Sequence, residues 1–146
     1  MPIFPGIFYN AILVSALTAW LIAQVLKIAA NLFLLRKLNF QLIFSSGGFP
    51  SSHSATVSAL TLGIGKYYGW DSPIFAVSAV YGMVVLYDAA GVRRAAGKQA
   101  EVLNQLVERL SQGSDLAQDR LKELIGHTPF EVFGGVIVGI IVGLWL

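Results

Sequence analysis

The length and spacing of its apolar runs constrain this chain more than any other feature. Four such runs lie at about residues 8–35, 53–68, 73–90 and 129–146. A helix needs roughly 20 residues to cross the bilayer core. The first run is longer than this, the third and fourth are close to it, and the second is shorter. Lipid offers the backbone no hydrogen bonds, so continuous runs of this kind cross it as helices. The sequence therefore predicts an all-α integral membrane bundle of about four transmembrane helices, forming one domain over residues 1–146.

The composition agrees with a membrane protein. Only 12% of the 146 residues are charged, whereas soluble domains carry about 25%. The absence of cysteine excludes disulfides and thiolate metal sites. A net charge of +2 is too small to indicate a nucleic-acid partner. The first run is too long for the core of a signal peptide and follows a segment without basic residues, so we expect it to be retained.

One polar stretch, residues 91–126, separates the last two runs. Apolar residues recur in it at helical spacing, opposite charged ones, at Val102, Leu103, Leu106, Val107 and Leu110. This pattern predicts an amphipathic helix that could lie on the membrane, cap the bundle or pair with a second subunit. We expect residues 111–114 to end it and residues 115–125 to form another short helix.

The positive charges predict an orientation. With four spans, the loops at residues 36–52 and 91–126 lie on the same side of the membrane. These loops contain most of the basic residues, namely Arg36, Lys37, Arg93, Arg94, Lys98, Arg109, Arg120 and Lys122. Basic loops stay in the cytoplasm. We therefore expect a multi-pass protein with this side, including the amphipathic helix, facing the cytoplasm and both termini facing away.

Both histidines fall on this predicted cytoplasmic side. His53 begins the second apolar run after a Gly-Gly-Phe-Pro-Ser-Ser segment, and His127 lies just before the fourth run. Ser51 or Ser52 can cap the helix that follows, and a helix N-terminus suits a phosphate group. His53 alone could merely cap a helix or reach the interface. Together the two histidines predict a phosphate site at the cytoplasmic face.

Glu131 has two possible roles. The segment from Thr128 to Glu131 fits a capping box with proline at the first helical position, so Glu131 could simply reach back to the backbone of Thr128. Alternatively, Glu131 could hydrogen-bond one nitrogen of His127, fix its tautomer and make the other nitrogen a better nucleophile. We favour the second role because His53 has matching surroundings.

Two ionisable residues lie at membrane depth, where such groups are rare and usually functional. Lys27 could reach the interface or point inward at an anion, and we favour the inward position. Asp88 could pair with Arg93 or Lys27 to hold a basic cluster. Arg93 and Arg94 could anchor the span end, contact lipid headgroups or bind two phosphate oxygens at once.

Other motifs in the chain are either structural or absent. Gly135, Gly139 and Gly143 recur every four residues and predict a close-packing helix face. We find no metal-ligand spacing, no phosphate-binding loop of the P-loop type and no dinucleotide fingerprint, so we expect no metal and no cofactor.

The histidine motifs resemble those of the type 2 phosphatidic acid phosphatase superfamily, which includes vanadium haloperoxidases. The segment Pro50-Ser51-Ser52-His53 is similar to its Pro-Ser-Gly-His motif, with serine for glycine. His127 and Glu131 are similar to the second half of a later motif, with glutamate for aspartate. Leu121 stands where that motif has arginine, and the early lysine and arginine motif is also degenerate, with Arg36 at a longer spacing after Lys27.

The match looks closest to the divergent, small membrane branch of this superfamily and covers nearly the whole chain. Signatures of that branch look like residues 87–94, Gly97-Lys98-Gln99 and Asn104. The resemblance implies that His127 is the nucleophile, that His53 protonates the leaving group and that Glu131 orients His127. The substrate-binding residues would be Lys27, Arg93, Arg94, Ser51, Ser52 and Asp88.

These expectations combine into a metal-independent lipid phosphatase that forms a phosphohistidine at the cytoplasmic face. Its phospholipid substrate would be a phosphomonoester such as phosphatidylglycerol phosphate or phosphatidic acid, with an isoprenoid phosphate less favoured. The alternative is a non-catalytic scaffold or assembly factor that binds anionic lipid. A haloperoxidase is disfavoured because the expected arginine is missing. The thin bundle could form a homodimer through the last span or the amphipathic helix.

Overall fold

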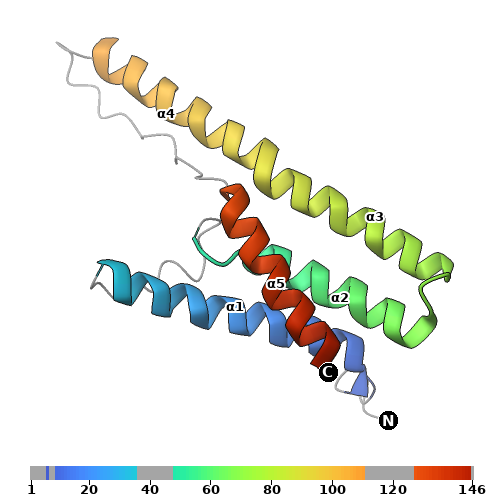
Figure 1. Cartoon of the computed structure of the whole chain (residues 1–146). Coiled ribbons are helices and arrows are strands. Elements are labelled where there is room, and N and C mark those ends of the chain that lie inside the picture. The colour runs from blue at the N-terminus through green and yellow to red at the C-terminus, as the bar shows by residue number, and fades with distance from the viewer. Residues whose placement is uncertain (1–5, 7–8, 36–47, 111–126, 146) are drawn as a thin grey trace.

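A computed structural model describes residues 6, 9–35, 48–110 and 127–145, and these residues are helical with short connections. The helices are α1 (Ala11–Leu35), α2 (Ser52–Tyr68), α3 (Pro73–Tyr87), the π-helical turn η3 (Asp88–Val92), α4 (Arg93–Leu110) and α5 (Pro129–Trp145). Figure 1 shows their arrangement. The all-α prediction is correct, and the four apolar runs correspond to α1, α2, α3 and α5. The short helix predicted at residues 115–125 lies outside the described residues.

Local capping signals fix where three of these helices begin. The Ser51 hydroxyl accepts the backbone N–H of Ser54 at 3.3 Å and caps α2. Ser72 caps α3 in the same way, with proline at its first turn. Thr128 accepts the N–H of Glu131 at 3.3 Å at the start of α5. These caps satisfy donors that the first helical turn leaves free.

The helices alternate in direction, and α2 contacts α1, α3 and α5. In Figure 1, α5 crosses in front of α2, and the first turn of α1 and the last turn of α5 lie together at one end of the bundle. The other end contains the last turn of α1, the first turns of α2 and α5, and the junction of α3 with η3. This topology brings the loop before α2 and the loop before α5 to the same end.

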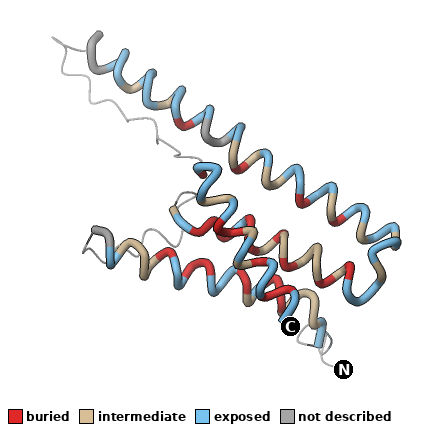
Figure 2. Tube along the Cα trace, viewed as in Figure 1, coloured by how far each residue is buried: buried red, intermediate tan, exposed pale blue. Residues whose placement is uncertain are grey.

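Small residues let α5 approach α2 closely. Alanines and one valine form the core, namely Ala19, Ala23, Ala55, Ala59 and Val142. A Cβ added to Gly135 would collide with the carbonyl oxygen of Ser51, and one added to Gly139 would collide with that of Ala55. Figure 2 shows the buried positions concentrated where the helices face one another. The glycine spacing is therefore a close-packing face, as predicted, and its partner is α2.

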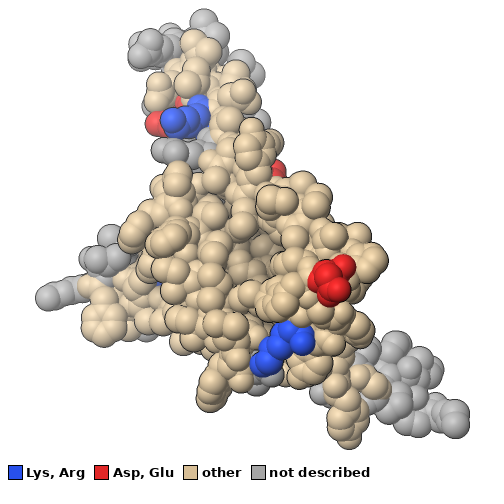
Figure 3. Space-filling model, turned by 45° about the vertical axis from the view of Figure 1, so that its right-hand side comes forward, with Lys and Arg blue, Asp and Glu red and all other residues tan. Residues whose placement is uncertain are grey.

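The outer surface of the bundle is apolar, with large exposed side chains such as Val25 on α1, Val84 on α3 and Ile141 on α5. Charged side chains are sparse on the face in Figure 3. Such a surface suits a lipid environment. Two helical stretches, Ala11–Phe33 and Pro73–Val107, are long and apolar enough to cross a membrane, and Pro129–Trp145 is apolar but shorter. These features are those of a helical membrane protein.

The amphipathic helix is present but does not start where the polarity changes. α3 continues through η3 into α4, so the third apolar run and the amphipathic segment form one long helix (Figure 1). α4 extends beyond the bundle, and its apolar side chains, including Leu103 and Leu106, are exposed. The sequence left three positions open for this helix: on the membrane, as a cap over the bundle, or against a second subunit. Its described residues do not form a cap over the bundle.

Candidate active site

The two histidines lie beside each other at one end of the bundle. Their ring centroids are 6.1 Å apart in an edge-to-face arrangement. His53 is the second residue of α2 and is exposed, whereas His127 lies two residues before α5 and is only 1% exposed. The sequence predicted that both lie on the same side, and the fold brings them into one site.

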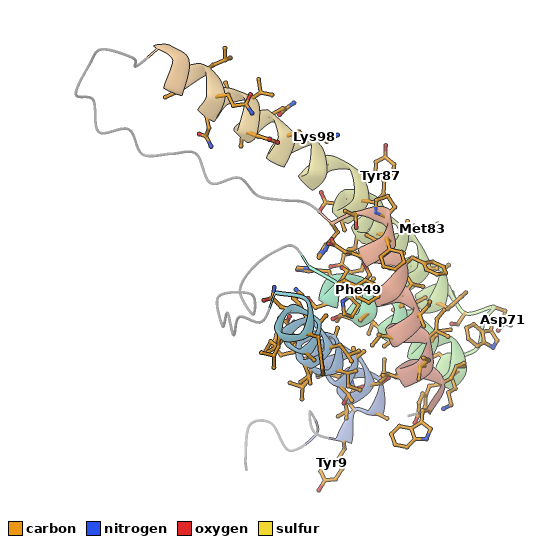
Figure 4. All side chains as sticks on the ribbon, turned by 60° about the vertical axis from the view of Figure 1, so that its left-hand side comes forward. Tyr9, Phe49, Asp71, Met83, Tyr87 and Lys98 are labelled. Carbon is orange, nitrogen blue, oxygen red and sulfur yellow. The ribbon has the colours of Figure 1, made fainter. Side chains whose placement is uncertain are left out.

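The starts of α2 and α5, beside which the histidines lie, are joined directly. The backbone N–H of Ser51 donates to the carbonyl oxygen of Glu131 at 2.9 Å. The rings of Phe49 and Phe130 stack with centroids 5.0 Å apart, and Phe49 also lies over Gly134. Phe49 is labelled in Figure 4, where it lies at the end of the bundle near the first turn of α2. The relative position of the histidines is therefore set by backbone and aromatic contacts around them.

Glu131 makes both of the contacts that the sequence left open. Its Oε2 atom lies 3.2 Å from Nδ1 of His127 and accepts the backbone N–H of Thr128 at 2.9 Å. A carboxylate at Nδ1 favours the tautomer that has its proton there, which leaves Nε2 as the free base. Glu131 thus closes the capping box and orients the imidazole with the same oxygen.

Two buried polar atoms at this end have no hydrogen-bond partner among the described residues, namely Nε2 of His127 and Nζ of Lys27. Lys27 is 2% exposed, so its side chain points inward. A buried ammonium group and a buried imidazole nitrogen without partners are costly unless something polar joins them. A phosphoryl group supplies oxygens for the ammonium and an electrophilic phosphorus for the imidazole.

Gly48 makes room for the lysine. Its φ angle is 104°, in the region that favours glycine, and an added Cβ would lie 3.1 Å from Cδ of Lys27. Gly48 stands before a histidine motif, which was the available signal, but the lysine that it accommodates comes from α1 and could not be assigned from spacing.

The surroundings of His127 also set its protonation. Burial lowers the pKa of His127 below its ordinary value; the hydrogen bond and the charge of Glu131 act in the opposite direction, and positive charge on Lys27 or His53 lowers the pKa further. The net effect is a lowered pKa. His127 is therefore neutral near pH 7, which is the form that can act as a nucleophile.

The remaining predicted site residues lie around this centre. The buried Ser51 hydroxyl is engaged in capping and also accepts from the Ser54 hydroxyl at 2.9 Å. Ser52 is buried in the first turn of α2, next to His53. Asp88 begins η3 and lines a groove together with His53. Asp88 makes no hydrogen bond to Lys27, because the Lys27 ammonium has no hydrogen-bond partner among the described residues.

Arg93 and Arg94 are the first two residues of α4, directly after the π-helical turn, and their side chains lie outside the described part of the chain. Lys98, further along α4, lies well beyond the end of the bundle (Figure 4). Within the described ranges no group of three or more His, Cys, Asp or Glu side chains could hold a metal ion.

Comparison with known proteins shows the family of this chain. The sequence profile of the Divergent PAP2 family matches residues 8–142. The chain is 44% identical over 148 residues to the uncharacterized membrane protein YuiD of Bacillus subtilis (strain 168), and the match covers 94% of each chain. No solved structure matches the chain. The apolar helices, the paired histidine motifs and the family match lead to one conclusion: this chain belongs to the divergent PAP2 family of membrane proteins.

Proposed function

We propose that the protein is a metal-independent phosphatase that hydrolyses a phosphomonoester lipid through a phosphohistidine. The observation that carries this proposal is the buried His127, whose Nδ1 contacts Glu131 and whose Nε2 is unpartnered, near an equally buried and unpartnered Lys27 ammonium. This arrangement supports an oriented nucleophile together with a positive charge for the phosphoryl oxygens.

In the first step, Nε2 of His127 attacks phosphorus, a P–N bond forms, and the bond from phosphorus to the lipid oxygen breaks. His53 donates a proton to the departing alkoxide, so that a neutral alcohol leaves. In the second step, His53 removes a proton from water, the water oxygen attacks phosphorus, and the P–N bond breaks to release phosphate. The exposure of His53 suits a group that exchanges protons with water.

Phosphoryl transfer depends mainly on neutralising charge on the equatorial oxygens. Lys27 supplies one charge from inside the bundle, and Arg93 and Arg94 supply others from the start of α4. This chain has Leu121 where the resembling motif has arginine, and in this proposal Arg93 and Arg94 take the place of that arginine. Ser52 adds a hydrogen bond from the first turn of α2, while Ser51 holds that turn in place.

The site faces the cytoplasm in this proposal, with α1, α2, α3 and α5 crossing the membrane. The basic loops at the site end support that orientation. A substrate such as phosphatidylglycerol phosphate or phosphatidic acid, on the cytoplasmic leaflet, then has its phosphate at the level of His127. Since α2 covers the glycine face of α5, α4 is the favoured surface for a homodimer.

A second candidate is a scaffold that binds anionic lipid without hydrolysing it. The exposed apolar face of α4, which extends beyond the bundle, favours this function because it offers a surface for a partner. In that case the two histidines and Lys27 would hold a phosphate headgroup, and Leu121 in the place of an arginine would explain the lack of turnover.

The deciding experiment measures phosphate release by the purified full-length protein in detergent with EDTA. The substrates are phosphatidic acid, phosphatidylglycerol phosphate and an isoprenoid phosphate, and His127→Ala and His53→Ala run beside the parent with Lys66→Met as a control from the opposite end of the bundle. We expect release that survives EDTA and falls at least about 100-fold in both histidine variants. Absence of release from every lipid would favour the scaffold.

A further inference from the structure

A groove runs from His53 across α2, between α1 and α3. Its volume is about 420 Å³. α2 provides the floor, which includes the buried Val57, while Trp20 of α1 and Tyr81 of α3 form exposed rims. The complete lining is Trp20, His53, Thr56, Val57, Tyr81, Val84, Val85 and Asp88. In a membrane the exposed rims contact lipid, so the groove opens sideways into the bilayer.

The groove is polar at one end and apolar at the other. His53 and Asp88 mark the polar end, at the first turn of α2 and the end of α3. Tyr81 and Trp20 lie toward the middle of their helices. The seven-residue distance from Tyr81 to Asp88 corresponds to about 10 Å along a helix. This length fits the part of a lipid nearest its phosphate rather than a whole acyl chain.

The chemistry of the proposed reaction assigns this groove to one part of the substrate, and the assignment rests on the proposed function. A general acid has to reach the leaving oxygen, and this oxygen carries the lipid. In-line attack places the leaving group on the side of phosphorus away from the nucleophile. The lipid therefore lies on the His53 side of the phosphate and not on the His127 side.

Two other apolar grooves lie along the bundle, and neither histidine lines them. One, of about 350 Å³, lies between α1 and α5 and includes Phe49 and Val138. The other, of about 230 Å³, lies among α2, α3 and α5 and includes Val136. Among these three grooves, only the one at His53 combines the proposed general acid with an apolar wall.

We propose that the groove between α1 and α3 binds the leaving-group end of a phosphomonoester lipid, meaning its glycerol carbons and the first methylenes, which enter sideways from the bilayer. The groove then determines the preference for lipid over small soluble phosphomonoesters. A soluble ester needs only the phosphate site, whereas a lipid needs the phosphate site and the groove.

The test places bulk in the groove without touching the site. Val85→Trp fills the α3 wall, while Val136→Trp and Val138→Trp place the same bulk in the two other grooves, and all three valines are half-buried. Release is measured from phosphatidic acid and from p-nitrophenyl phosphate. We expect Val85→Trp to lower kcat/KM for the lipid about tenfold or more and to change it less than about twofold for the soluble ester.

The result that overturns the proposal is equal loss for both substrates in Val85→Trp, or selective lipid loss in Val138→Trp or Val136→Trp instead. Either result leaves the phosphatase function standing. Parent protein that hydrolyses neither substrate would instead refute the proposed function.

A binding measurement tests the groove independently of turnover and of the folding of Val85→Trp. Phosphatidic acid with a diazirine on the first carbons of an acyl chain is photolysed with the His127→Ala variant in detergent. We expect label on the α1 and α3 peptides that contain Trp20 and Tyr81, and less label when unmodified phosphatidic acid competes. Label concentrated on α5 would refute the groove assignment, as would label that phosphatidic acid does not displace.

Discussion

At the scale of single residues, the site depends on one carboxylate oxygen with two partners. Oε2 of Glu131 accepts the N–H of Thr128 and contacts Nδ1 of His127. The first contact stabilises the start of α5, and the second orients the proposed nucleophile. A substitution that keeps the hydrogen-bond acceptor but removes the charge separates the two effects.

Glu131→Gln is that substitution. Glutamine is accepted in a capping box, so we expect the melting temperature in detergent to change little. Phosphate release should fall roughly 10- to 1,000-fold, because an amide fixes and stabilises the imidazole less well than a carboxylate does. Thermal melting and kcat are measured on the same preparation. Proportional loss of stability and activity would mean that Glu131 acts only as a cap.

The pH dependence follows from the lowered pKa of His127. The neutral imidazole is the nucleophile, and its fraction rises with pH through the pKa of the folded protein. Since that pKa lies below the ordinary value of about 6.5, the acidic limb of kcat/KM that reports His127 should have its midpoint below pH 6.5.

Lys27→Met removes a positive charge that lowers the pKa of His127. We therefore expect the acidic limb of the pH profile to move to higher pH, in addition to a lower plateau. The profile is recorded for the parent and the variant with p-nitrophenyl phosphate. A limb that stays in place, or moves to lower pH, would show that the lysine does not act on this histidine.

At the scale of the elements, the contact between α2 and α5 positions the site. The glycine face of α5 lets the carbonyl of Ser51 approach Gly135, about one turn from the point where the backbone N–H of Ser51 donates to the carbonyl of Glu131. Helix packing and site geometry are therefore set by the same contact. Overpacking in such a place forces the backbone to move.

Gly135→Ala should accordingly destabilise the protein by about 1–3 kcal/mol and lower phosphate release more than about tenfold. Gly91→Ala is the matched control, because an added Cβ there meets nothing within 4 Å. Both variants are compared by melting temperature and by kcat/KM. Helix propensity alone would make both variants more stable, because alanine favours a helix more than glycine does. Equal damage in Gly91→Ala would therefore contradict the packing explanation.

At the scale of the whole molecule, the alternating helices place the histidines at one end, and the first turn of α1 and the last turn of α5 at the other. The chain has no cysteine, so single cysteines report the topology cleanly. In intact cells we expect Asp71→Cys to react with an impermeant maleimide and Lys98→Cys to react only after permeabilisation. These positions lie toward opposite ends of the molecule (Figure 4). Equal labelling of both would contradict a cytoplasmic site.

Much of the fold could be predicted because its signals are local. Apolar runs mark the helices, Ser51 and Thr128 mark where two of them begin, and the glycine repeat marks a packing face. The sequence could not show that α3 continues into α4 as one helix. The change of polarity at residues 88–92 marks where the helix leaves an apolar environment, which is not necessarily where the helix ends. Helical hydrogen bonds continue there regardless of polarity.

The sequence could predict the two histidine motifs of the site, but not the distances and contacts between their residues. The sequence placed His53 and His127 on one side and offered two roles each for Glu131 and Lys27. The inward position of Lys27 and the bond from Ser51 to Glu131 depend on contacts between helices that are distant in the sequence. No spacing rule contains this information, since it arises only when α1, α2 and α5 pack together.

The bond between Ser51 and Glu131 also has a consequence for timing. His53 emerges from the ribosome early and His127 late, and the backbone contact that aligns them cannot form until α5 has entered the membrane and docked on α2. In the proposed mechanism, a partly synthesised or prematurely terminated chain therefore has the acid but not the nucleophile. Docking of the last helix completes the proposed site, so only finished molecules would act on lipid phosphates in the surrounding membrane.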